Sequence, residues 1–86
     1  MKVEELIQEL ESCAQRLGVE VRRDKGDFEG GLCRVKDRRL IILNEKVPVT
    51  KQLRILAREL ARLEVDQVYL VPAVRELIES ASDEAL

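Results

Sequence analysis

The apolar positions between residues 53 and 63 predict an amphipathic helix at the centre of the chain. At about 100° per residue, they fall on one side of such a helix. They are Leu53, Leu56, Ala57, Leu60, Ala61 and Leu63. Arg54, Arg58 and Arg62 recur every four residues and form a basic stripe along another side. Gln52 and Glu59 flank the stripe. Because like charges at this spacing repel, the stripe requires carboxylate neighbours or an anionic ligand.

Helical spacing of apolar residues also predicts a helix near each end of the chain. The first runs from Lys2 to Leu17, and Gly18 is suited to end it. The last begins at Pro72 and runs to about Ser82. The central helix is expected to start near Pro48, with Thr50 as its N-cap.

Three strand patterns lie between the first and the central helix. Residues 19–23 alternate, and residues 32–36 and 39–43 flank turn chemistry typical of a hairpin. The continuous apolar run at residues 40–43 indicates a central strand that is covered on both sides. We therefore predict a single α+β domain over residues 1–86: an N-terminal helix, a three-stranded antiparallel meander and two C-terminal helices, in the order α-β-β-β-α-α.

Composition supports a folded domain with a small aliphatic core. The chain has 86 residues, of which 45% are hydrophobic and only 2% aromatic, so Leu, Val, Ile and Ala must form the core. Charged residues make up 37%, yet the net charge is only -2. Since general nucleic-acid binders are normally basic overall, this balance makes nucleic acid an unlikely partner.

The sequence carries no visible export or membrane signal. The N-terminal stretch M-K-V-E-E-L-I-Q is charged, and no apolar run approaches the roughly 20 residues that cross a bilayer. The two cysteines do not make a disulfide framework. Cys13 lies on the apolar side of the first helix, and Cys33 can face the core or the solvent. We expect a cytoplasmic protein with reduced thiols and no membrane association.

The segment Arg58-Glu59-Leu60-Ala61-Arg62, on a helix that follows a strand, resembles a minimal zincin-like domain of the ImmA/IrrE type of metallopeptidase. The resemblance covers roughly residues 32–64. In that family the helix carries H-E-x-x-H, whose two histidines bind zinc and whose glutamate is the general base. Glu59 matches the glutamate, whereas Arg58 and Arg62 occupy the positions of the zinc ligands.

This departure removes the chemistry of a zinc peptidase. Arginine has no lone pair to offer a metal, and the chain contains no histidine. We therefore expect no enzyme activity, no catalytic residue, no metal and no cofactor. If the resemblance reflects ancestry, Glu59 pairs with the neighbouring arginines; if it is chance, Glu59 is a solvated helix residue, which the sequence favours slightly. Pairing of Glu59 with Glu64 or Asp66 as acid and base is not distinguished by spacing from ordinary surface charge.

These observations favour a non-catalytic binding or interaction module, acting with a protein partner or as a homo-oligomer. The resemblance implies that it is an inactive relative of zincin-like metallopeptidases. The alternative is a site for anions or nucleic acid on the stripe formed by Arg54, Arg58 and Arg62, extended by Arg38 and Arg39. The chain lacks the interleaved aromatic residues with which single-strand binders stack bases. The candidate surface comprises Arg54, Arg58, Glu59 and Arg62.

Overall fold

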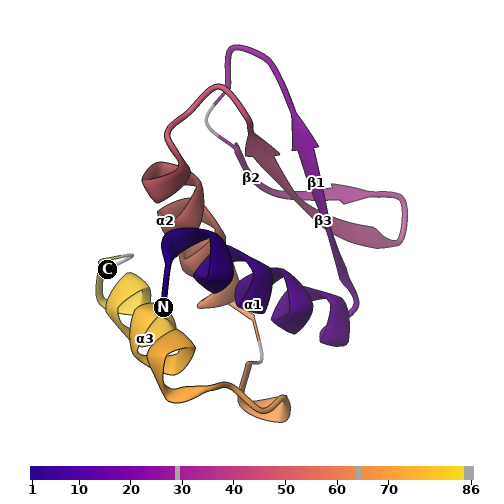
Figure 1. The fold of residues 1–86 in the computed structure, drawn as a ribbon. Helices are drawn as coiled ribbons and strands as arrows, with labels where there is room; N and C mark the ends of the chain where they lie inside the picture. Colours follow the sequence, from indigo (N-terminus) through magenta and orange to yellow (C-terminus); the bar gives the residue numbers. More distant parts are fainter. Residues whose placement is uncertain (29, 64, 85–86) are drawn as a thin grey trace.

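The structure, a computed structural model that describes residues 1–28, 30–63 and 65–84, confirms the α+β class and the order of elements (Figure 1). The elements are α1 (Val3–Arg16), β1 (Val19–Asp24), β2 (Gly30–Val35), β3 (Arg38–Asn44), α2 (Val49–Leu60), the 3₁₀ turn η1 (Val65–Gln67) and α3 (Pro72–Glu84). No helix in the described part of the chain is both long and apolar enough to cross a membrane.

The ends of the helices follow local chemistry, with one correction. Gly18 has φ 77 directly after the C-cap of α1, as a residue that ends a helix in the left-handed region should. The prediction of Thr50 as an N-cap is wrong: Pro48 is the N-cap of α2, and Thr50 lies within its first turn. After Leu60 the helix gives way to a turn. The N–H of Ala61 still donates to the Ala57 carbonyl, but those of Arg62 and Leu63 donate three residues back, to the Glu59 and Leu60 carbonyls at 3.2 and 3.0 Å.

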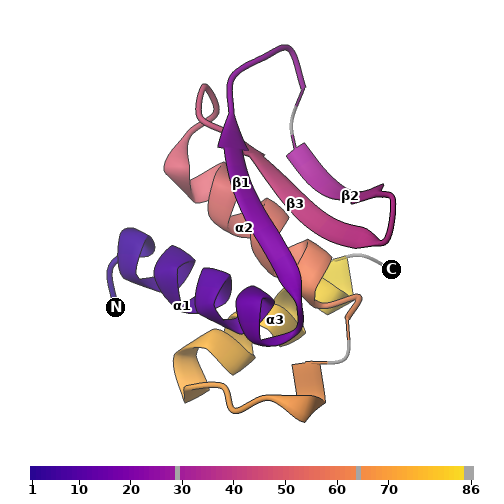
Figure 2. The ribbon, with the colours of Figure 1, turned by 90° about the vertical axis from the view of Figure 1, so that its right-hand side faces the viewer.

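The sheet is mixed, so the predicted antiparallel meander is wrong. Its strand order is β1-β3-β2: β3 lies in the middle, parallel to β1 and antiparallel to β2 (Figure 2). Lys36, with φ 58, and Asp37 form the tight turn from β2 to β3. After β1 the chain crosses to the far edge of the sheet, where it forms β2. The hairpin then places β3 between β1 and β2. The most apolar strand thereby gains hydrogen-bonded neighbours on both edges.

Helix α2 is the element around which the core is built. It contacts β2 and β3 on one side and α1 and α3 on another. All four leucine and alanine positions predicted for its apolar side within α2 are buried. Ile55 and Gln52 are also buried, on the side of the helix that the predicted apolar face left out, and Gln52 Nε2 donates to the Val47 carbonyl at 2.9 Å. Contact on two sides therefore leaves α2 only a narrow polar side.

The two cysteines occupy different environments. Cys13 is fully buried, as its place on the apolar side of α1 predicts, whereas Cys33 on β2 is exposed. Burial raises the pKa of the Cys13 thiol above its ordinary value of 9.0, and the Arg16 guanidinium opposes part of that rise. Cys13 is accordingly a neutral core residue near neutral pH.

Candidate functional site

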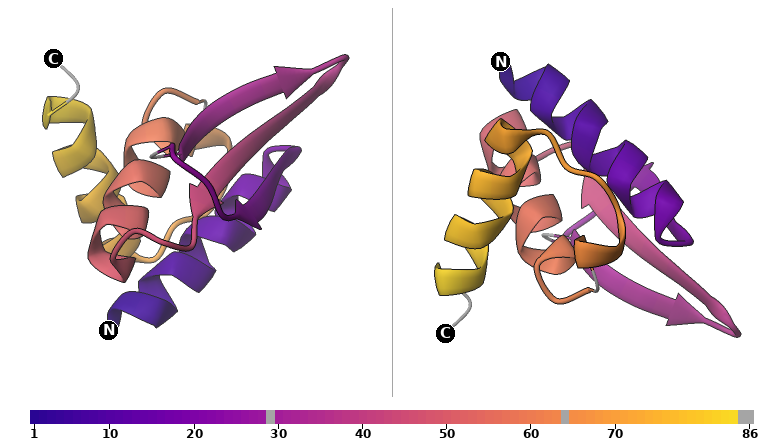
Figure 3. Two further views of the ribbon diagram at one scale, coloured as in Figure 1. Left: turned by 90° about the horizontal axis from the view of Figure 1, so that it is seen from above. Right: turned by 90° about the horizontal axis from the view of Figure 1, so that it is seen from below.

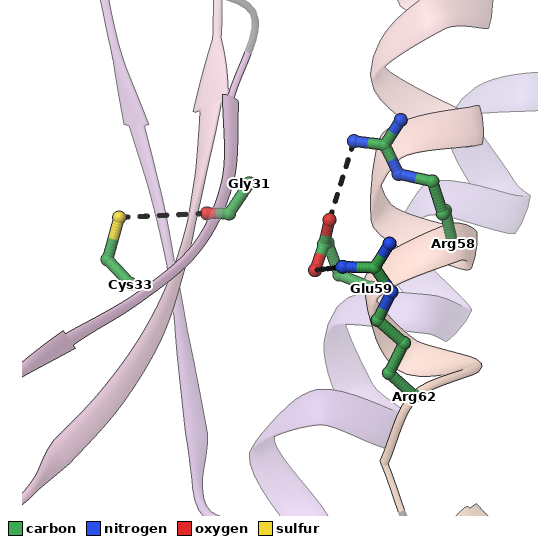
Figure 4. Close-up of polar contacts among 5 residues, drawn as sticks. All are labelled: Gly31, Cys33, Arg58, Glu59 and Arg62. Atoms are coloured by element: carbon green, nitrogen blue, oxygen red, sulfur yellow. Dashed lines mark hydrogen bonds and ion pairs between the residues drawn. The ribbon is translucent and has the colours of Figure 1, made fainter. Parts of the chain in front are cut away.

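Glu59 lies between Arg58 and Arg62 on the part of α2 that looks toward β2 (Figure 4). Its Oε1 is 3.4 Å from Arg58 Nη2, and its Oε2 is 3.7 Å from Arg62 Nη1. The residue is only 4% exposed. The interpretation of Glu59 as a solvated surface residue is therefore wrong: its carboxylate is buried and faces two guanidinium groups. We call these three residues the Glu59 cluster.

The burial of Glu59 follows from its place on the second contact side of α2. It stands one helical turn after Ile55, which is 3% exposed, and two turns after Gln52. Gly31 on β2 lies beside it, since a Cβ added at Gly31 would be 3.8 Å from Glu59 Oε1. Residues 52, 55 and 59 have helical spacing in the sequence. Because two of the three are polar, this spacing did not predict a second buried side of the helix.

The charges of the Glu59 cluster do not balance, and its ion pairs are long. Two guanidinium groups face one carboxylate, which leaves an excess of positive charge. Strong charge-assisted bonds of this kind measure roughly 2.7–2.9 Å, so contacts at 3.4 and 3.7 Å are long. Arg58 Nε is buried with no hydrogen-bond partner among the described residues. The cluster can attract a negatively charged or acceptor group, but its arginines cannot ligate a metal.

Other side chains predicted for the site lie in different places. Arg54 is exposed one turn before Arg58 on α2, and Arg38 is exposed at the start of β3. Arg39 is half-buried, and its Nη2 donates to the Leu17 carbonyl at 2.9 Å, so it points to the end of α1. Glu64 and the side chain of Asp66 lie outside the described residues. In the described part, no group of three or more His, Cys, Asp and Glu side chains is arranged to hold a metal ion.

A pocket of about 420 Å³ brings together three arginines from three separate parts of the chain. Arg16 is the last residue of α1, Arg39 belongs to β3, and Arg62 follows α2. Leu17 and Leu63 form part of its wall. Sequence reasoning missed Arg16 because nothing in the spacing of these residues indicates that their elements end at one place.

The second notable surface is the outer edge of β2. In the described sheet β2 pairs with β3 alone, and the β2–β3 hairpin projects beyond the helices (Figure 3). Leu32 is 38% exposed, Val35 54% and the preceding Phe28 40%. A pocket of about 370 Å³ beside this edge is lined in part by Phe28, Leu32, Cys33 and Ile42. The edge thus combines unpaired backbone with accessible apolar side chains.

Comparisons of the chain with protein-family models, with curated proteins and with solved structures found no significant match. The arginine-lined pocket, the open edge of β2 and the Glu59 cluster are therefore the features of the molecule that bear on its function.

Proposed function

We propose that this protein is a non-catalytic interaction module whose partner adds a strand to the open edge of β2. The observation that carries the proposal is the edge itself, with its exposed Leu32 and Val35. An edge strand presents a row of backbone donors and acceptors, and proteins that do not use such an edge usually protect it with charge, proline or a covering element. Added strands gain affinity from main-chain hydrogen bonds and specificity from side-chain pockets.

The surroundings of the edge favour a preformed surface. Asn44, which is 2% exposed, donates from Nδ2 to the Gly26 carbonyl at 2.8 Å and also to the Phe28 carbonyl. Its Oδ1 accepts from the Lys46 N–H at 3.0 Å. These bonds tie the backbone that leads into β2 to the end of β3, so the apolar pocket beside Phe28 is held from both strands.

The partner that fits this edge is a second copy of the chain. Two β2 strands pair antiparallel about a two-fold axis, as closed dimers require. When the axis passes at Leu32, the two Leu32 side chains lie opposite each other on one face, and Arg34 of each copy lies opposite Gly30 of the other. The two arginines then avoid each other.

Size-exclusion chromatography with light scattering tests this proposal. The wild type is expected to be a dimer that dissociates on dilution. Val35→Lys places a charge on the open edge and should yield a monomer, because a lysine there opposes strand pairing. Val49→Lys is the matched control: Val49 is 40% exposed at the start of α2, and its substitution should leave the dimer intact. A wild type that stays monomeric at high concentration would refute strand addition by a second copy.

We further propose that the chain is an inactive relative of zincin-like peptidases. The support is local: β3 leads into α2, and Arg58 and Arg62, at the positions of the two zinc ligands, flank a buried Glu59. The proposal predicts that the purified protein contains no stoichiometric zinc. Zinc bound in equal amount to the protein, and lost on substitution of Glu59, would contradict it. The two free thiols favour action in the reducing cytoplasm.

Anion binding is the second candidate function. The stripe on α2 favours it less than the sequence indicates, because Arg58 and Arg62 share the Glu59 carboxylate. The pocket lined by Arg16, Arg39 and Arg62 favours anion binding more, because none of its described lining side chains is a carboxylate.

A further inference from the structure

The pocket that contains Arg16, Arg39 and Arg62 concentrates positive charge in a recess. No carboxylate is present among the side chains that line it in the described part of the chain. Arg62 contacts Glu59 at 3.7 Å, but this pair is long and Arg62 remains 58% exposed. The pocket thus differs from the chain as a whole, in which acidic and basic residues nearly balance.

Two of the three arginines donate to backbone carbonyls near the end of α1. Arg39 is anchored by its bond to the Leu17 carbonyl, which uses one of the five N–H donors of its guanidinium group. Arg16 lies in the last turn of α1, with Nε 3.4 Å from the Ser12 carbonyl. A planar guanidinium presents two parallel donors to two oxygens of one phosphate, which makes Arg the preferred residue for bidentate phosphate recognition.

Size and wall chemistry restrict the ligand further. The volume of about 420 Å³ lies within the range of small-molecule sites. Leu17, Leu63 and Val68 supply apolar wall beside the charged groups. We propose that this pocket binds the phosphate group or groups of a small phosphorylated molecule, whose compact apolar part rests against these three residues. The proposal is independent of strand addition at β2.

Titration calorimetry with inorganic pyrophosphate at low salt is the direct test. The wild type should bind one pyrophosphate per chain. Arg16→Gln and Arg62→Gln should each weaken binding by about tenfold to a hundredfold, the loss expected for a charged hydrogen bond. Arg75→Gln, on the exposed side of α3 and outside the pocket, is the matched control and should bind as the wild type does.

Circular dichroism checks that each variant is folded. Arg39→Lys retains the positive charge but removes the planar guanidinium group with its paired donors, so it should weaken pyrophosphate binding in a folded protein. Backbone NMR shifts on adding pyrophosphate should concentrate at Leu17, Leu63 and Val68. Absence of binding at low salt, or equal loss in Arg75→Gln, would overturn the proposal. Binding of a short single-stranded RNA without binding of pyrophosphate would also overturn it, in favour of a nucleic-acid surface.

Discussion

Replacing Glu59 by glutamine tests whether the Glu59 cluster stabilises the fold or costs it stability. The substitution keeps the shape of the side chain and removes its charge. Two interactions are lost, with Arg58 at 3.4 Å and with Arg62 at 3.7 Å. Because the side chains of these partners are 40% and 58% exposed, each pair is worth about 0.2–1 kcal/mol.

Against this loss stands the desolvation of the carboxylate. The Glu59 side chain is 6% exposed, and the effective penalty for burying an ion is several kcal/mol. Removing one partner of a buried pair is normally destabilising because the other charge stays buried and unpaired. The substitution adds little of that cost here, because Arg62 is 58% exposed and can turn to solvent, while Arg58 Nε is already buried without a partner among the described residues when Glu59 is present. We therefore expect Glu59→Gln to raise the free energy of unfolding by about 1–2 kcal/mol.

Urea unfolding of the wild type and the variant measures this difference, and thermal unfolding provides a second readout of about 4–8 °C per kcal/mol for a domain of this size. Glu79→Gln, on the exposed side of α3, is the control and should change stability by less than about 0.5 kcal/mol. A loss of stability in Glu59→Gln that exceeds the control would refute the reasoning, because it would mean that the long contacts outweigh desolvation. A gain would mark Glu59 as a residue that the fold does not require, which is typical of functional positions.

Two further predictions concern backbone and core. Gly30 has φ +119, and a Cβ there would lie 2.5 Å from the Ile42 carbonyl oxygen, so Gly30→Ala should lose about 3 kcal/mol or more in urea unfolding. Gly18→Ala is the control, with φ +77 and no atom within 4 Å, and should lose about 1 kcal/mol; equal losses would show that the contact with Ile42 is unimportant. Burial raises the pKa of Cys13, so the folded state holds this proton more tightly than the unfolded chain does. Stability should therefore be unaffected below the ordinary pKa of the unfolded thiol and fall as pH rises above it, with a steeper fall in the wild type than in Cys13→Ala; identical slopes would contradict this assignment.

Local periodicity was sufficient to predict the helices and strands. It was not sufficient to predict which strands pair with each other. The amphipathic pattern of α1, the Gly18 stop and the Pro72 start depend on neighbouring residues, and all three are confirmed. The position of β2 outside β3 depends on how the connection after Asp24 crosses the sheet. An antiparallel meander satisfies the same hydrophobic pattern, so nothing in that pattern distinguishes it from the mixed sheet.

The candidate site shows the same division between local and distant information. That Arg54 and Arg58 share a side of α2, with Arg62 just beyond its end, follows from their spacing. That Glu59 is buried depends on β2 lying over α2, and hence on the sheet order that the sequence left open. The pocket forms because the end of α1, the start of β3 and the turn after α2 lie together. Arg16 and Arg62, which are far apart in the sequence, therefore line the same pocket.

Arg62 connects the Glu59 cluster with the pocket, because it contacts Glu59 and also lines the recess beside Arg16 and Arg39. Its guanidinium can face the carboxylate or an anion in the pocket, and two negative partners compete for the same donors. Glu59 therefore sets how much of the Arg62 charge the pocket offers when empty. A carboxylate held at 3.7 Å keeps that side chain near the recess without occupying it, as a preorganised anion site requires.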